Sequence, residues 1–335
     1  MNFLIGASNH TWQPVMSTDT TAPSYWLNWR FLLCATWMLS AMVIAAFLIW
    51  RYECCNKSRK GERDNREEKA RSLYKNEVWG TSSKDIHPLW LLAYRIICFC
   101  ILLALLLADA ITNSAGIFYF YTEWTFTLVT IYFGVGSLIS IHGCVRYFRE
   151  VDGERNDDSD AERGSYVAPS LEDKEDLPSM TRSLNHQREP LDCRTADAWE
   201  YAFQILFQIC AGAVTLTDSV FWLIIYPFLT DKDFRLHFLV VCMHSVNAVF
   251  LLGETFLNRL RFPFFRIAYF ALWTCVFVIF QWIIHACISM WWPYSFLDLS
   301  SPYAPIWYLG VGLLQLPCFA IFTLIFRIKQ FCLSR

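Results

Sequence analysis

The chain has 335 residues, of which 55% are hydrophobic, 17% aromatic and 17% charged, whereas a soluble globular domain has roughly 25% charged residues. Its formal net charge is −2, so it lacks the basic field that attracts nucleic acid, and we expect no nucleic-acid partner. This composition is typical of an integral membrane protein. It excludes collagen-like, disulfide-stabilised and wholly disordered chains.

Seven apolar segments are long enough to cross a membrane as helices. About 20 mainly apolar residues suffice, because each helical residue rises ~1.5 Å and the hydrocarbon layer is ~30 Å thick. The sequence therefore predicts an all-α polytopic bundle with seven transmembrane helices at 29–50, 89–109, 124–145, 199–226, 236–257, 265–290 and 305–326. In the fourth span, Gln204, Gln208 and Asp218 indicate a helix that is broken.

The distribution of Lys and Arg predicts the orientation of this bundle. With the N-terminus outside and the C-terminus inside, all but a few of the 28 Lys and Arg residues fall in inner segments, as the positive-inside rule requires. The predicted organisation is an outer tail (1–28), helices one to three (29–145) with a charged cytoplasmic loop (51–87), an acidic disordered linker (146–198), helices four to seven (199–327) and a cytoplasmic tail (328–335). The endoplasmic reticulum, other endomembranes and the plasma membrane fit this pattern equally well.

Two short patterns are candidates for covalent modification. Asn9 begins a glycosylation sequon in the outer tail. Cys54 and Cys55 follow the first span on its inner side, where palmitoylation occurs. Unmodified thiols are the alternative interpretation of this cysteine pair.

Polar side chains in the outer half of the bundle form a candidate site. At ~1.5 Å per residue, Asp218 and His244 lie at a similar depth, with Thr127 and Thr130 somewhat nearer the outer surface. A carboxylate can orient an imidazole, which then activates a hydroxyl group for attack on an ester. The alternative is that these residues only form interhelical hydrogen bonds, which are common in membrane proteins.

The fifth span places further polar residues on the face that carries His244. Asn247, Leu251 and Glu254 follow at helical spacing, so this face is expected to point inward. We predict that Asn247 lines a substrate cavity together with His285 from the sixth span. No pair of His residues at metal-binding spacing is present, and we predict neither a metal nor a cofactor.

The other polar and aromatic residues have structural interpretations. Arg95 is expected to extend toward the lipid headgroups, and Glu254 to pair with Arg259 or Arg95. Polar residues thin out in the inner half of the predicted bundle, which argues against a transport path. The aromatic residues at span ends are expected to form an interfacial belt; they include Trp26, Trp124, Trp291, Trp292 and Trp307.

Two membrane-protein families resemble parts of this chain. The run YTEWTFTLVTIYFGVGSLISIHGC at 121–144 is similar to the rolling-stone-like proteins, in particular their plant members. A more distant likeness links 95–329 to the androgen-induced transmembrane hydrolase family, through FWLIIYP at 221–227, MHSVNAVFLLGE at 243–254, and the His285 segment followed by WWPYSFLD.

The second resemblance implies hydrolysis of fatty acid esters by an intramembrane Thr and His. The His matches His244. The family places its Thr four residues after a Trp, whereas Leu128 stands at that distance from Trp124, and Thr127 matches only with a one-residue gap.

The leading hypothesis is an outer-leaflet cavity that binds membrane lipid and hydrolyses a lipid ester. Thr127 would attack the carbonyl, with Thr130 as a substitute, His244 would accept the proton and Asp218 would orient the imidazole. The alternative is a non-enzymatic protein of cell–cell interaction, adhesion or fusion, because rolling-stone-like proteins are linked to cell fusion. Neither hypothesis predicts particular protein partners.

Overall fold

The computed structural model describes residues 19–54, 78–83, 86–113, 118–163, 198–229 and 236–333, without the side chains of residues 54, 113, 150–163 and 229. The described residues form helices and no strand, apart from an isolated bridge between Thr81 and Asn258. Within the described part of the chain, seven helical segments are long and apolar enough to cross a membrane. The prediction of a multi-pass helical membrane protein is therefore confirmed.

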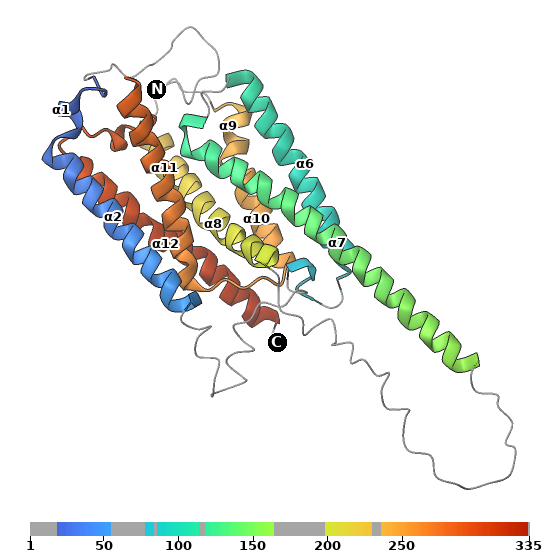
Figure 1. The fold of residues 1–335 in the computed structure, drawn as a ribbon. Coiled ribbons are helices and arrows are strands. Elements are labelled where there is room, and N and C mark those ends of the chain that lie inside the picture. Colours follow the sequence, from blue (N-terminus) through green and yellow to red (C-terminus); the bar gives the residue numbers. More distant parts are fainter. Residues whose placement is uncertain are drawn as a thin grey trace, which may run out of the picture.

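The seven segments form one elongated bundle (Figure 1). They are α2 (Trp29–Ile49) with the π-helical turn η2 (Trp50–Cys54), α6 (Pro88–Asn113), α7 (Tyr121–Arg163), α8 (Ala198–Val220) with the π-helix η5 (Phe221–Leu229), α9 (Phe238–Met243) with α10 (Val246–Leu257), α11 (Ile267–Cys287) and α12 (Ala304–Leu333). Short helices are α1 (Pro23–Trp26), η6 (Phe264–Arg266) and η7 (Ser295–Leu297). We call the two ends of the bundle the α1 end and the C-terminal end.

The outer surface of the bundle is apolar, as contact with lipid requires. On α2, for example, Leu32, Val43 and Ile44 are all more than half exposed. Such large exposed hydrophobic side chains would destabilise a water-soluble helix bundle by exposing apolar area to water.

Helix α7 is packed against both α6 and α8, while α10 contacts α6 and α8 as well. Helices α11 and α12 pack against α2 and α8. Aromatic rings fill the space between these elements; Tyr132 of α7, for instance, stacks on Phe203 of α8 with ring centroids 4.6 Å apart. The candidate site is thus enclosed by a rigid, closely packed scaffold.

Three elements differ from the predicted helices. The fifth span is interrupted at His244 and Ser245, and the fourth ends in the π-helix η5, which contains Pro227. Helix α7 continues to Arg163, so the first part of the predicted disordered linker is helical. The rest of that linker lies outside the described residues.

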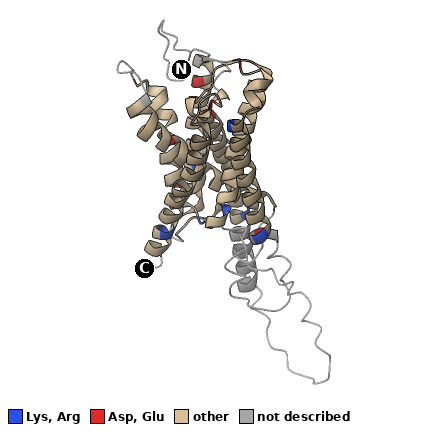
Figure 2. Ribbon diagram, turned by 90° about the vertical axis from the view of Figure 1, so that its left-hand side faces the viewer, with Lys and Arg blue, Asp and Glu red and all other residues tan. Residues whose placement is uncertain are grey.

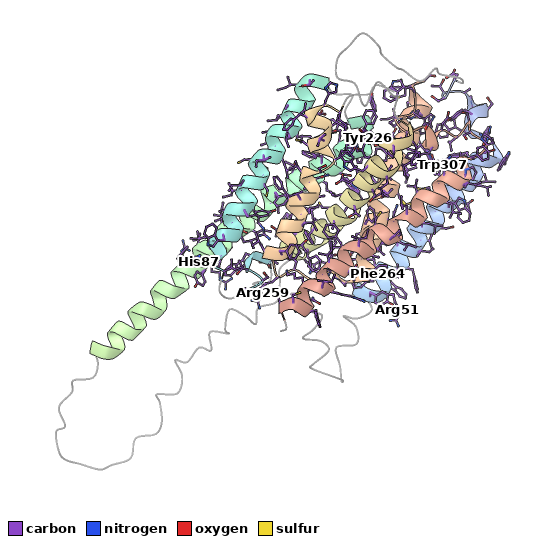
Figure 3. All side chains as sticks on the ribbon, turned by 180° about the vertical axis from the view of Figure 1, so that it is seen from behind. Arg51, His87, Tyr226, Arg259, Phe264 and Trp307 are labelled. Atoms are coloured by element: carbon purple, nitrogen blue, oxygen red, sulfur yellow. The ribbon has the colours of Figure 1, made fainter. Side chains whose placement is uncertain are left out.

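Most of the described Lys and Arg residues lie at the C-terminal end (Figure 2). In Figure 3, Arg51 and Arg259 are labelled at this end, with Tyr226 and Trp307 at the α1 end. The exposed Trp307 indole occupies the place expected of an interfacial aromatic residue. Which end faces the cytoplasm stays a prediction.

Candidate functional site

The interruption of the fifth span determines where His244 lies. The His244 amide closes α9 by donating to Val240, and α10 starts again at Val246, with Ser245 between them at φ −147° and ψ −42°. The Trp222 indole donates to the His244 carbonyl oxygen at 2.7 Å. This bond satisfies a backbone group that the break exposes, which stabilises the break in an apolar environment.

The His244 side chain is fixed between an aromatic ring and a carboxylate. Its ring stacks on Phe221, with centroids 3.8 Å apart and planes nearly parallel. Its Nδ1 lies 3.7 Å from Oδ1 of Asp218, and the two side chains are only 11% and 13% exposed. Neither Asp218 oxygen nor His244 Nδ1 has a closer hydrogen-bond partner among the described residues. The structure therefore brings together the predicted Asp–His pair.

His244 also lines a cavity of about 70 Å³, large enough for several water molecules or a short stretch of acyl chain. The walls come from α7, α8 with η5, α11, α12 and the segment that connects α11 to α12. They are mainly apolar, with contributions from Leu216, Val220, Phe221, Ile225, Phe277, Val278, Phe296, Leu297 and Val311. An imidazole on the wall of an apolar cavity is suited to chemistry on a lipid rather than on a polar solute.

Hydroxyl groups on the cavity wall were not among the predicted site residues. Tyr121 and Thr274 share a hydrogen bond of 3.0 Å, and Thr217, which precedes Asp218, donates to Ala213 at 2.7 Å. Tyr294 accepts from the Tyr121 amide at 3.0 Å, and burial raises the pKa of Tyr294 to about 12. The sequence signal that could have predicted hydroxyl groups here is that Thr217 directly precedes the predicted site residue Asp218.

Thr127 points away from Asp218 and His244. The hydroxyl groups of Thr125 and Thr217 are 3.4 Å apart, so Thr125 faces α8. Thr127 follows two residues later, about 200° around the helix, and it is not among the cavity-lining residues. Thr130 does not line the cavity either, and its hydroxyl donates to the Phe126 carbonyl at 2.9 Å. The structure therefore does not bring the predicted nucleophile to the histidine.

Of the two predicted cavity residues, Asn247 is buried, its Oδ1 accepts from the Ala248 amide at 2.8 Å, and it is not among the residues that line the cavity. His285 is fully buried elsewhere: Nδ1 lies 2.8 Å from the Gln281 carbonyl oxygen, and the ring stacks on Trp292. It does not line the cavity. Trp292 is itself only 7% exposed, so its predicted place in an interfacial belt is wrong.

The prediction for Arg95 is also wrong. Its side chain is fully buried and forms an ion pair with Glu254, with Nη2 and Oε1 2.5 Å apart. Arg95 Nη1 donates to Ser140, and the Tyr132 hydroxyl donates to Glu254 at 2.8 Å. The sequence left two possible partners for Glu254, Arg259 and Arg95, and in the structure its partner is Arg95. A buried acceptor offsets the cost of burying the guanidinium.

A second polar network occupies the C-terminal half of the bundle. Arg266 donates to Glu53 at 2.9 Å and to the Gln204 side chain at 2.7 Å, while Gln204 and Gln208 both donate to the Arg261 carbonyl. These glutamines anchor a loop and do not mark a break in the fourth span. Polar residues therefore do not thin out in this half, contrary to the sequence prediction. Their bonds to protein groups indicate a structural role.

The two modification predictions concern residues whose side chains are not described. Asn9 and Cys55 lie outside the described residues, and Cys54 ends η2 without a described side chain. Among the residues that are described, no group of three or more His, Cys, Asp or Glu side chains is placed to hold a metal ion.

Comparison of the chain with models of protein families, with curated proteins and with solved structures finds no match. The family resemblances seen in the sequence therefore stay predictions, and the function is argued from the site.

Proposed function

We propose that this multi-pass membrane protein binds a lipid acyl chain in the cavity and hydrolyses its ester, with His244 as the general base. The observation that supports the proposal is the buried Asp218–His244 pair, 3.7 Å apart, on the wall of an apolar cavity. Buried polar atoms without partners are rare in folded proteins and are concentrated at functional sites.

In the proposed reaction, an oxygen nucleophile attacks the ester carbonyl carbon while His244 accepts its proton. Asp218 stabilises the imidazolium that results. The protonated imidazole then gives its proton to the departing alkoxide, which leaves as an alcohol. With water as the nucleophile, the other product is the free fatty acid.

The nucleophile has two candidates. The family resemblance implies Thr127, which would first form an acyl-enzyme. The orientation of α7 favours water instead, because Thr127 faces away from α8. A Thr127→Val variant distinguishes them, because only a Thr nucleophile requires that hydroxyl.

The test is hydrolysis of a panel of long-chain lipid esters by the full chain purified in detergent. His244→Gln is expected to lower kcat/KM by at least ~10²-fold, the usual contribution of a general base, and Asp218→Asn to lower it as well. His237→Gln is the matched control, since His237 is exposed near the α1 end. Equal turnover by wild type and a folded His244→Gln variant would contradict the proposal.

A non-enzymatic role in cell–cell interaction, adhesion or fusion is the second candidate. It is favoured by the packing of His244, whose ring stacks on Phe221 and whose carbonyl binds Trp222. In that case His244→Gln lowers thermal stability, while neither it nor wild type hydrolyses the esters above an empty-membrane control.

A further inference from the structure

The π-helix η5 forms part of the cavity wall and also part of the outer surface of the bundle. Phe221 and Ile225 line the cavity and are only 1% and 6% exposed. Leu223 and Phe228 of the same element are 68% and 78% exposed. In a membrane this apolar outer side contacts the hydrocarbon layer, so a single helical element lies between the cavity and the lipid.

Helix α12 forms a second wall of this kind. Val311 lines the cavity and is half-buried, and the residues on both sides of it, Gly310 and Gly312, are exposed. A Cβ atom added to either glycine would meet no described atom within 4 Å. Because the glycines carry no side chains, another molecule can approach the α12 backbone closely on both sides of Val311.

Both walls lie toward the α1 end of the bundle. Tyr226 directly follows Ile225, and Trp307 precedes Val311 by about one helical turn; both aromatic residues are labelled at this end in Figure 3. Their side chains are 36% and 47% exposed, as is typical of aromatic residues near the headgroup level. The two walls therefore face the lipid leaflet at the α1 end.

Of the two walls, η5 has the weaker backbone structure. A π-helix is held by hydrogen bonds between residues five apart, is rare, and is found frequently at functional sites. Pro227 lies inside η5 and has no N–H group, so one of these bonds is missing. Displacing η5 therefore breaks fewer backbone hydrogen bonds than displacing a regular helix of the same length.

We propose that the acyl chain of a membrane lipid enters the cavity sideways from the bilayer, between η5 and α12, and that Ile225 and Val311 set the width of this entrance. The inference rests on the proposed binding of an acyl chain in the same cavity. Both side chains are apolar, so an acyl chain that passes between them stays in apolar surroundings and does not cross water.

The experiment uses the full chain in phospholipid vesicles that contain palmitic acid with a photoreactive diazirine on its chain. Phe277 and Val278 of α11 line the cavity and are only 3% and 6% exposed, so a probe in the bilayer labels them only from inside the cavity. Mass spectrometry of the labelled protein identifies them. In wild type we expect labelling of these two residues that an excess of unlabelled palmitic acid prevents.

Two variants narrow the entrance. Val311→Phe enlarges a side chain of the wall, and the double variant Gly310→Leu with Gly312→Leu fills open space, so it should fold even if Val311→Phe does not. Each is expected to lower the labelling of α11 roughly tenfold or more, a usual effect of a size mismatch in a hydrophobic pocket. Leu324→Phe is the matched control, because Leu324 is an exposed residue of α12 outside the cavity wall.

The proposal is overturned if the two α11 residues are not labelled in wild type, or are labelled equally in wild type and the folded variants. Hydrolysis of long-chain esters by the same proteins separates this result from the proposed function. If wild type is labelled at α11, the variants lose the label and no ester is hydrolysed, the entrance is supported and the proposed hydrolysis is wrong. If the folded narrow variants hydrolyse the esters as fast as wild type does, the hydrolysis is supported and the entrance is wrong.

Discussion

The environment of a single polar residue in this bundle depends on which side chains pack against it in the folded protein. Arg95 has a side chain long enough to reach the headgroups, yet it is fully buried against Glu254. Arg95 was predicted to extend toward the headgroups because an isolated arginine has no polar partner in the hydrocarbon layer. The acceptor comes from α10, far along the chain, and its approach to Arg95 is a property of the packed bundle.

Removing one partner of this ion pair is expected to destabilise the protein much more than replacing both partners with apolar residues. Glu254→Leu leaves the Arg95 guanidinium buried without its carboxylate and should lower the free energy of unfolding by about 3–5 kcal/mol. The double variant Arg95→Met with Glu254→Leu should be much less destabilised, because no unpaired charge remains. Unfolding in mixed micelles measures both, with the exposed Arg259→Gln as control; equal losses in the single and double variants would show that the charge is not the cause.

At the scale of the element, the sequence predicts helices well and their interruptions poorly. The segment MHSVNA contains neither Pro nor Gly, so its sequence does not predict the break at His244 and Ser245. The bond from Trp222 to the His244 carbonyl offsets part of its cost. In the fourth span the π-helix contains Pro227, and a Pro, which lacks an N–H group, is a local signal for an irregular helix.

Close contact between α8 and α11 depends on Gly212. A Cβ atom added there would lie 2.6 Å from Phe270, whereas one at Gly310 of α12 would meet nothing within 4 Å. Gly212→Ala is therefore expected to lower the free energy of unfolding by ~1–3 kcal/mol through overpacking. Gly310→Ala should leave it unchanged or slightly higher. Thermal unfolding of the two variants tests this pair, and a stable Gly212→Ala protein would show that Phe270 moves aside easily.

For the whole molecule, the seven spans that the sequence predicts would place the two termini on opposite sides of the membrane. The structure has α1 and the C-terminus at opposite ends (Figure 1), and the Lys and Arg residues gather at the C-terminal end (Figure 2). Positive charges tend to stay on the cytoplasmic side, so the predicted orientation is N-terminus out.

Epitope tags at the two termini test this orientation in intact cells or sealed vesicles. We expect protease added from the cytoplasmic side to remove a C-terminal tag and to spare an N-terminal one. The reverse pattern would contradict the predicted orientation and invert the bundle.

The sequence by itself determined the spans, because an uninterrupted run of apolar residues is a local property that the thickness of the bilayer converts directly into a helix. It also determined that Asp218 and His244 lie at one depth, since depth follows from residue count. Only the tertiary structure decided which polar groups meet. Rotation about each helix axis and the break at His244 depend on packing between distant segments. The orientation of Thr127 away from α8, the burial of Arg95 and the hydroxyl groups of the cavity wall therefore could not be read from spacing alone.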